Sequence, residues 1–107
     1  HKVIGLAAPR FQGDPDTVLE ALIRVARAEP RVRRLDGSVD EGMITFVART
    51  KRMGFRDYVT FKAVSEGSET KLAAISRSRY EIGSDWGVNR ERLERWFAEI
   101  EDVLAER

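Results

Sequence analysis

The polar side chains best suited to chemistry lie in the stretch from Ser76 to Arg90, which joins an alternating strand to the last helix of the chain. Arginine side chains and the free backbone N–H groups at a helix start both favour a bound anion. A carboxylate on a neighbouring strand completes the group. We name these candidates for ligand or partner binding the polar corner: Asp57, Arg77, Arg79, Asp85, Asn89 and Arg90.

The sequence leaves two interpretations of the polar corner open. In the first, Asp57, Arg77, Arg79 and Asp85 form a structural network of ion pairs that fixes the last helix on the sheet. In the second, the corner binds a partner or a small anionic ligand. Catalysis is disfavoured because carboxylates within reach of several arginines have lowered pKa values and are poor general acids or bases near neutral pH. We therefore predict no catalytic residue, with a small hydrolase-like enzyme that uses Asp57 or Asp85 as the alternative.

Several other kinds of site are excluded by composition. The chain has no cysteine, and its single histidine is His1, so thiol chemistry, histidine-dependent triads and metal sites built on these residues are not expected. Gly83 and Gly87 do not form a nucleotide-binding glycine pattern. A net charge of +1 is too small to attract nucleic acid. We predict no cofactor, no metal and no nucleic-acid partner.

Length and composition are typical of one soluble globular domain. The 107 residues are 42% hydrophobic and 35% charged, so we predict a single domain over residues 1–107. The longest apolar run is far shorter than the roughly 20 residues that span a bilayer. The chain begins with His1 rather than Met, and we expect a natural N-terminal segment to precede it.

An N-terminal helix is predicted over residues 14–29. Asp14 can accept hydrogen bonds from free N–H groups of the first turn, and Pro15 suits the first helical position. Pro30 ends the pattern. Residues 1–12 show no clear period, which predicts an irregular or edge segment.

Antiparallel strands are predicted within residues 43–80, where apolar and polar residues alternate in three runs separated by short polar turns. A further short strand is expected at residues 31–35, followed by a tight turn at Asp36-Gly37. The basic residues of that short strand are expected to lie at a solvated edge.

Turn positions suggest a register for the three strands. We expect Phe46 opposite Val59 and Val59 opposite Ile75, which gives one continuous apolar face. The same register sets Asp57 opposite Arg77.

A C-terminal helix is predicted over residues 89–106, with Asn89 as its N-cap and an apolar stripe centred on Trp96. The elements together predict an α+β fold with two layers. An antiparallel sheet of three to five strands carries the N-terminal and the C-terminal helix on one face.

The motif from Ser84 to Arg90, preceded by Ser78-Arg79, resembles the signature of the bacterial and plastid domain of unknown function 1499 family. The segment from Gly54 to Tyr58 is similar to that family's Phe-x-Asp-Asp segment. The resemblance extends from about Met43 to Trp96.

This chain departs from the family pattern in two places. Tyr58 stands where the family has the second aspartate, and the interval between Arg79 and Asp85 is one residue longer than usual. The resemblance implies no established activity. It implies a small envelope-associated protein, often with an N-terminal membrane anchor, so we expect an uncharacterised, non-enzymatic envelope or accessory domain in the periplasm or at the cell envelope.

Overall fold

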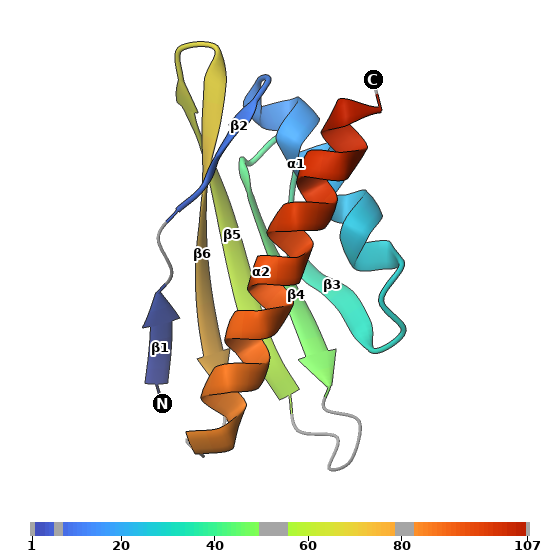
Figure 1. Cartoon of the computed structure of the whole chain (residues 1–107). Coiled ribbons are helices and arrows are strands. Elements are labelled where there is room, and N and C mark those ends of the chain that lie inside the picture. The colour runs from blue at the N-terminus through green and yellow to red at the C-terminus, as the bar shows by residue number, and fades with distance from the viewer. Residues whose placement is uncertain (1, 6–7, 50–55, 79–82, 107) are drawn as a thin grey trace.

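The computed structural model describes the backbone of residues 2–5, 8–49, 56–78 and 83–106, and the side chains of residues 8–49, 56–75 and 91–106. Six strands and two helices follow one another within these ranges (Figure 1). They are β1 (Lys2–Gly5), β2 (Arg10–Gln12), α1 (Pro15–Arg27), β3 (Val32–Ser38), β4 (Met43–Arg49), β5 (Arg56–Glu66), β6 (Glu69–Ser78) and α2 (Gly83–Ala105).

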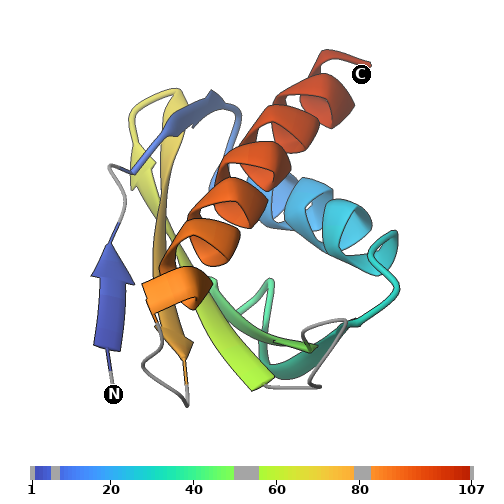
Figure 2. The same cartoon turned by 60° about the horizontal axis from the view of Figure 1, so that its bottom comes forward.

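The strands form one antiparallel sheet in the order β1-β6-β5-β4-β3, and β2 pairs with the other end of β6. Figures 1 and 2 show both helices on the same side of this sheet, with α2 running diagonally across it. The α+β fold with an N-terminal and a C-terminal helix, predicted from the sequence, is confirmed.

The core lies between the two helices and the covered face of the sheet, and Trp96 of α2 is at its centre. The Trp96 ring stacks on Phe61 at a centroid distance of 5.9 Å and meets Phe46 edge-on at 5.8 Å. All three side chains are buried. Aromatic pairs in these geometries add to the hydrophobic stabilisation of a core.

The predicted register is right between β4 and β5 and wrong by one residue between β5 and β6. Phe46 faces Val59 as expected, but Val59 faces Ser76 rather than Ile75. The cause is the turn, because only two residues separate Glu66 from its partner Glu69. A shift of one residue exchanges the two faces of a strand, and Ile75 is therefore 41% exposed on the open face.

The predicted turn at Asp36-Gly37 is also wrong, since both residues lie inside β3. The register with β4 shifts between Arg34 and Asp36, which marks a bulge. Gly37 has a φ of 86°, and a Cβ atom there would lie 2.1 Å from the Met43 carbonyl oxygen. A glycine at this position therefore serves a close approach within the strand pair.

The predicted start of α1 is right, and the predicted start of α2 is wrong. Asp14 is the N-cap of α1, where its Oδ1 atom accepts a hydrogen bond from the Thr17 N–H at 2.8 Å. The second helix begins at Gly83, so Asn89 lies inside α2 and is not its cap. Glycine is unfavourable in a helix by only about 1 kcal/mol, and the glycines before Asn89 do not stop the helix.

Candidate functional site

The polar corner lies at the end of the sheet where β5 begins, β6 ends and α2 begins (Figure 1). Arg77 is in the last part of β6, and Asp85, Asn89 and Arg90 are in the first turns of α2. The structure describes only the backbone of these four residues, and Arg79 lies outside the described residues.

Asp57 is buried at this end of the sheet, on the face that the helices cover. It lies opposite Ala48 of β4 and opposite Ser78 of β6. Arg77 pairs with Tyr58 instead. The expected placement of Asp57 opposite Arg77 is therefore wrong, and it fails for the same one-residue shift that exposes Ile75.

Arg92 of α2 is the described cation next to Asp57. Its Nη1 atom lies 4.0 Å from Asp57 Oδ2, and the two side chains are 14% and 2% exposed. Burial lowers the pKa of Arg92 from its ordinary value, although the carboxylates of Asp57 and Glu29 act in the opposite direction. This pair joins the sheet to the helix, which is the structural role expected for a buried carboxylate.

Arg92 was not among the predicted site residues, although the sequence holds a signal for it. It stands four residues before Trp96, and residues at this spacing share one face of a helix. The core-facing position of Trp96 therefore places Arg92 toward the sheet. The predicted helix start at Asn89 places Arg92 in the first turn, and for this reason the contact of Arg92 with the sheet is not predicted from the sequence.

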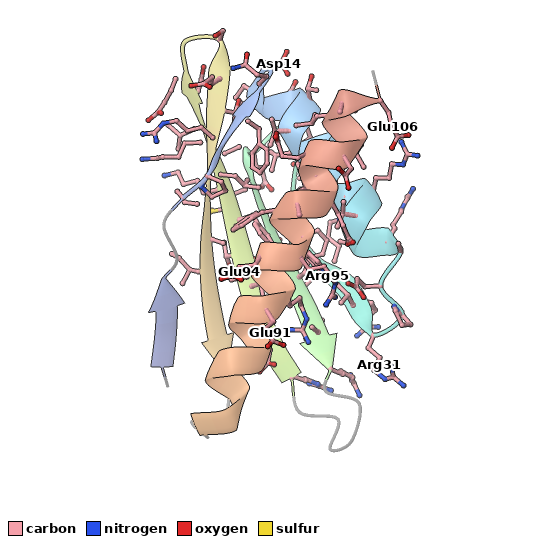
Figure 3. The ribbon with its side chains drawn as sticks, in the orientation of Figure 1. Asp14, Arg31, Glu91, Glu94, Arg95 and Glu106 are labelled. Atoms are coloured by element: carbon pink, nitrogen blue, oxygen red, sulfur yellow. The ribbon has the colours of Figure 1, made fainter. Side chains whose placement is uncertain are left out.

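Glu29 connects the segment after α1 to α2. Its Oε1 atom accepts a hydrogen bond from Trp96 Nε1 at 2.9 Å and another from Arg95 Nη2. Arg95 lies on the side of α2 nearest to α1 (Figure 3). Burial alone would raise the pKa of Glu29, but the hydrogen bonds from Arg95 and Trp96 and the charges of Arg95 and Arg92 outweigh it and lower the pKa.

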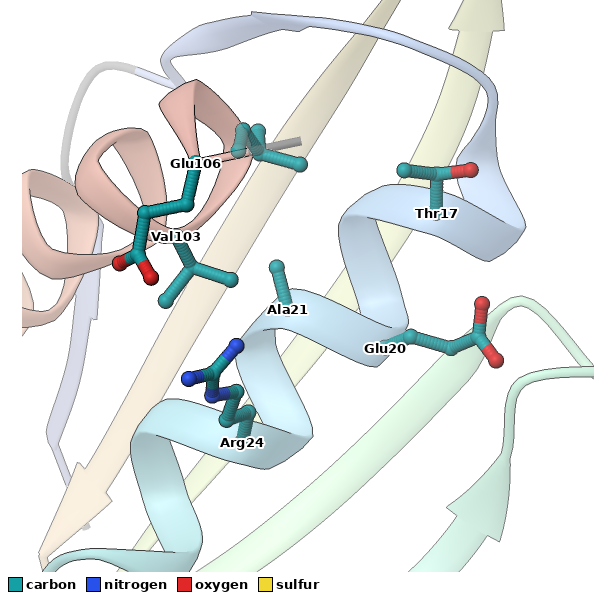
Figure 4. Close-up of a pocket in the computed structure, with 7 residues that line it drawn as sticks. Thr17, Glu20, Ala21, Arg24, Val103 and Glu106 are labelled. Carbon is teal, nitrogen blue, oxygen red and sulfur yellow. The ribbon is translucent and has the colours of Figure 1, made fainter.

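Two open hollows lie on the helical side. One, of about 350 Å³, separates α1 from the end of α2, with Arg24 and Glu106 on opposite sides of it (Figure 4). The other, of about 170 Å³, lies between α1 and β3. Within the part of the chain that the structure describes, no group of three acidic, histidine or cysteine side chains could hold a metal ion.

A model of the family described as "Protein of unknown function (DUF1499)" matches residues 5–100. The chain belongs to this family. The match to DUF1499 extends further toward the N-terminus than the segment from Met43 to Trp96 that carries the resemblance in sequence. No curated protein matches the chain.

One solved structure shares the fold of this DUF1499 domain. The crystal structure of protein MLL2253 from Mesorhizobium loti is similar at a TM-score of 0.77 and 12% sequence identity, over 98% of each chain. The crystal structure of TTHA0849 from Thermus thermophilus has a TM-score of 0.43 and 12% identity, over 97% of this chain and 92% of that one. At 12% identity, the likeness to MLL2253 concerns the fold alone.

Neither of the helices, over the residues that the structure describes, is both long enough and apolar enough to cross a membrane.

Proposed function

We propose that this DUF1499 chain is a non-enzymatic envelope or accessory domain that binds a small anionic ligand, or an anionic group of a partner, at the polar corner. The site would use Arg79, Asp85, Asn89 and Arg90 around the start of α2. Asp57 would form its buried floor together with Arg92. The envelope setting rests on the family resemblance described above.

The observation that carries this proposal is the early start of α2. Because the helix begins at Gly83, Asp85 and Asn89 are helical residues seven and three positions before Arg92. These spacings place all three on one face of α2, the face whose Arg92 approaches Asp57. A row of polar positions therefore leads from the buried pair toward the helix start.

The start of a long helix favours an anion. Its first N–H groups have no partner within the helix, and the aligned peptide dipoles place partial positive charge there. Arg79 and Arg90 flank this start in the sequence and add two full positive charges. A phosphate or carboxylate group matches these donors.

The non-enzymatic part of the proposal is supported by the state of the described acids near the corner. Asp57 is buried beside Arg92, and Glu29 accepts hydrogen bonds from Arg95 and Trp96. A general acid or base must reach the reacting atoms of a substrate, and a carboxylate enclosed in this way serves the fold instead. The hydrolase alternative therefore receives no support from Asp57.

A titration with inorganic phosphate tests the site. We expect phosphate to raise the Tm of the chain and to shift the amide resonances of residues 83–92 in heteronuclear NMR spectra. Arg90→Gln should abolish both effects. Arg56→Gln is the matched control, because Arg56 lies at the same end of the sheet but alternates with Asp57 and therefore faces away from α2.

Three results would contradict the proposal. The polar corner is not an anion site if phosphate shifts only amide resonances outside residues 83–92. The same conclusion follows if phosphate changes the Tm and the resonances of Arg90→Gln as it changes those of wild type. If a panel of esters and phosphate esters is hydrolysed, and Asp57→Asn abolishes turnover while the variant remains folded, the chain is an enzyme.

A further inference from the structure

The hollow between α1 and β3 combines an apolar floor with a basic rim. Its volume is about 170 Å³. The larger hollow between the helices carries an arginine and two glutamates, so it favours no single ligand charge. The smaller one carries charge of one sign only, and its lining residues are Ile23, Ala26, Arg27, Val32, Arg34 and Phe46.

The floor is part of the hydrophobic core and of its margin. Ala26 and Phe46 are buried, and Ile23 and Val32 are partly buried against them. An apolar group that enters the hollow would lose water-exposed surface against these side chains, which is favourable.

The rim is formed by two guanidinium groups from different elements. Arg27 comes from the last turn of α1, and Arg34 comes from β3, where it is the register partner of Phe46 and so lies on the covered face. Among the residues that the structure describes, neither arginine forms an ion pair or a side-chain hydrogen bond. Arg27 lies in the last turn of α1, where its positive charge interacts favourably with the helix dipole. Arg34 lies on a strand and has no such interaction.

Two like charges at one apolar hollow repel each other, and an anion between them would relieve this repulsion. Carboxylates are well matched to paired guanidinium groups, since each N–H···O contact is charge-assisted. We propose that this hollow binds a small organic anion, with its carboxylate at Arg27 and Arg34 and a short apolar body on the floor. The small volume limits that body to a short chain or a single ring. This site does not depend on the polar corner.

Benzoate is a suitable probe because it combines a carboxylate with one ring. Benzyl alcohol has the same ring without the charge, and inorganic phosphate has charge without an apolar body. We expect benzoate to shift the amide resonances of residues 23–27, 32–34 and 46 with saturation in the millimolar range, which is normal for so small a ligand. Benzyl alcohol and phosphate should shift these residues much less.

Arginine variants test the role of the rim. Arg27→Gln and Arg34→Gln should each weaken benzoate binding by about tenfold, the effect of losing one charge-assisted contact. Arg33→Gln is the matched control. It makes the same charge change on the same strand, but Arg33 pairs with Val47 and lies on the open face of the sheet, so benzoate binding should be retained.

Four results at the hollow itself would overturn the inference. They are an absence of shifts at the hollow, equal binding of benzyl alcohol, equal binding of phosphate, and equal weakening by Arg33→Gln. Shifts confined to residues 83–92 would assign benzoate to the polar corner and would also overturn it. Both rim arginines are exposed, so the variants should keep the wild-type Tm, and a melting curve for each variant checks this.

Discussion

Glu29→Gln should destabilise the junction between α1 and α2. The substitution keeps the size of the side chain but removes the negative charge of the carboxylate. The Oε1 atom of that carboxylate accepts hydrogen bonds from Trp96 Nε1 and Arg95 Nη2. The Glu29 side chain is only 22% exposed, so water screens these contacts incompletely. Hydrogen bonds to charged groups contribute about 1.5–3 kcal/mol each. Because the amide oxygen of glutamine can still accept both bonds but without the assistance of a charge, we expect a net loss of about 1–2 kcal/mol in the free energy of unfolding.

The destabilisation by Glu29→Gln should depend on pH. The pKa of Glu29 in the folded chain lies below its ordinary value of 4.5. Its charge therefore contributes stability that is fully present above the unfolded pKa and is lost as the pH falls through the lower, folded pKa. Wild type and variant should differ most near neutral pH and converge in acid.

Urea titrations followed by far-ultraviolet circular dichroism measure this difference at neutral and at acid pH. Glu101→Gln is the control, because it makes the same charge change at an exposed position of α2. The reasoning is refuted if Glu29→Gln is as stable as Glu101→Gln at neutral pH, or if its deficit is unchanged in acid.

Three further substitutions test the interior. Asp57→Asn should cost about 3 kcal/mol in urea titrations, because Arg92 would stay buried without this counter-charge; wild-type stability would show that the pair does not hold the fold. Trp96→Ala should cost about 3–5 kcal/mol through the cavity it leaves, and a loss below roughly 1 kcal/mol would mean that Trp96 is not core. Thr70→Val should cost about 1 kcal/mol, since the buried Thr70 hydroxyl donates a 2.8 Å hydrogen bond to the Gly13 carbonyl. An unchanged Tm for Thr70→Val would show that this bond is dispensable.

The sequence predicts strand faces well where only one alternate set of residues is apolar. In β5, Val59 and Phe61 alternate with Tyr58, Thr60 and Lys62, and the structure has the first set inside. The pattern fails in β6, where both alternate sets contain apolar residues.

In β6, the pair Leu72 and Ala74 competes with the pair Ala73 and Ile75 for the core. Alternation cannot decide between two apolar sets, so the length of the preceding turn decides. A loop of two residues, Gly67 and Ser68, sends Leu72 and Ala74 inward. The register predicted across this turn was wrong by one residue, and the expected pairing of Asp57 with Arg77 was wrong for the same reason.

The polar corner was only partly predictable for a related reason. Burial of Asp57 follows from the β4 and β5 pattern, and the structure agrees. The identity of its described partner depends on where α2 begins. A start at Asn89 leaves Arg92 at a frayed end, whereas a start at Gly83 puts Arg92 well inside a long helix that crosses the sheet.

The partner of Asp57 determines what the buried charges hold together. A strand arginine would have linked β5 to β6, which the backbone hydrogen bonds of the sheet already join. Arg92 links the sheet to α2 and also interacts electrostatically with Glu29, beyond the end of α1. Charges of alternating sign therefore connect the sheet, α2 and α1, and neighbouring members of such a network are coupled rather than additive. Asp57 and Glu29 thus help to fix both helices on the sheet. Among the described contacts, neither acid forms an ion pair with the arginines at the rim of the small hollow.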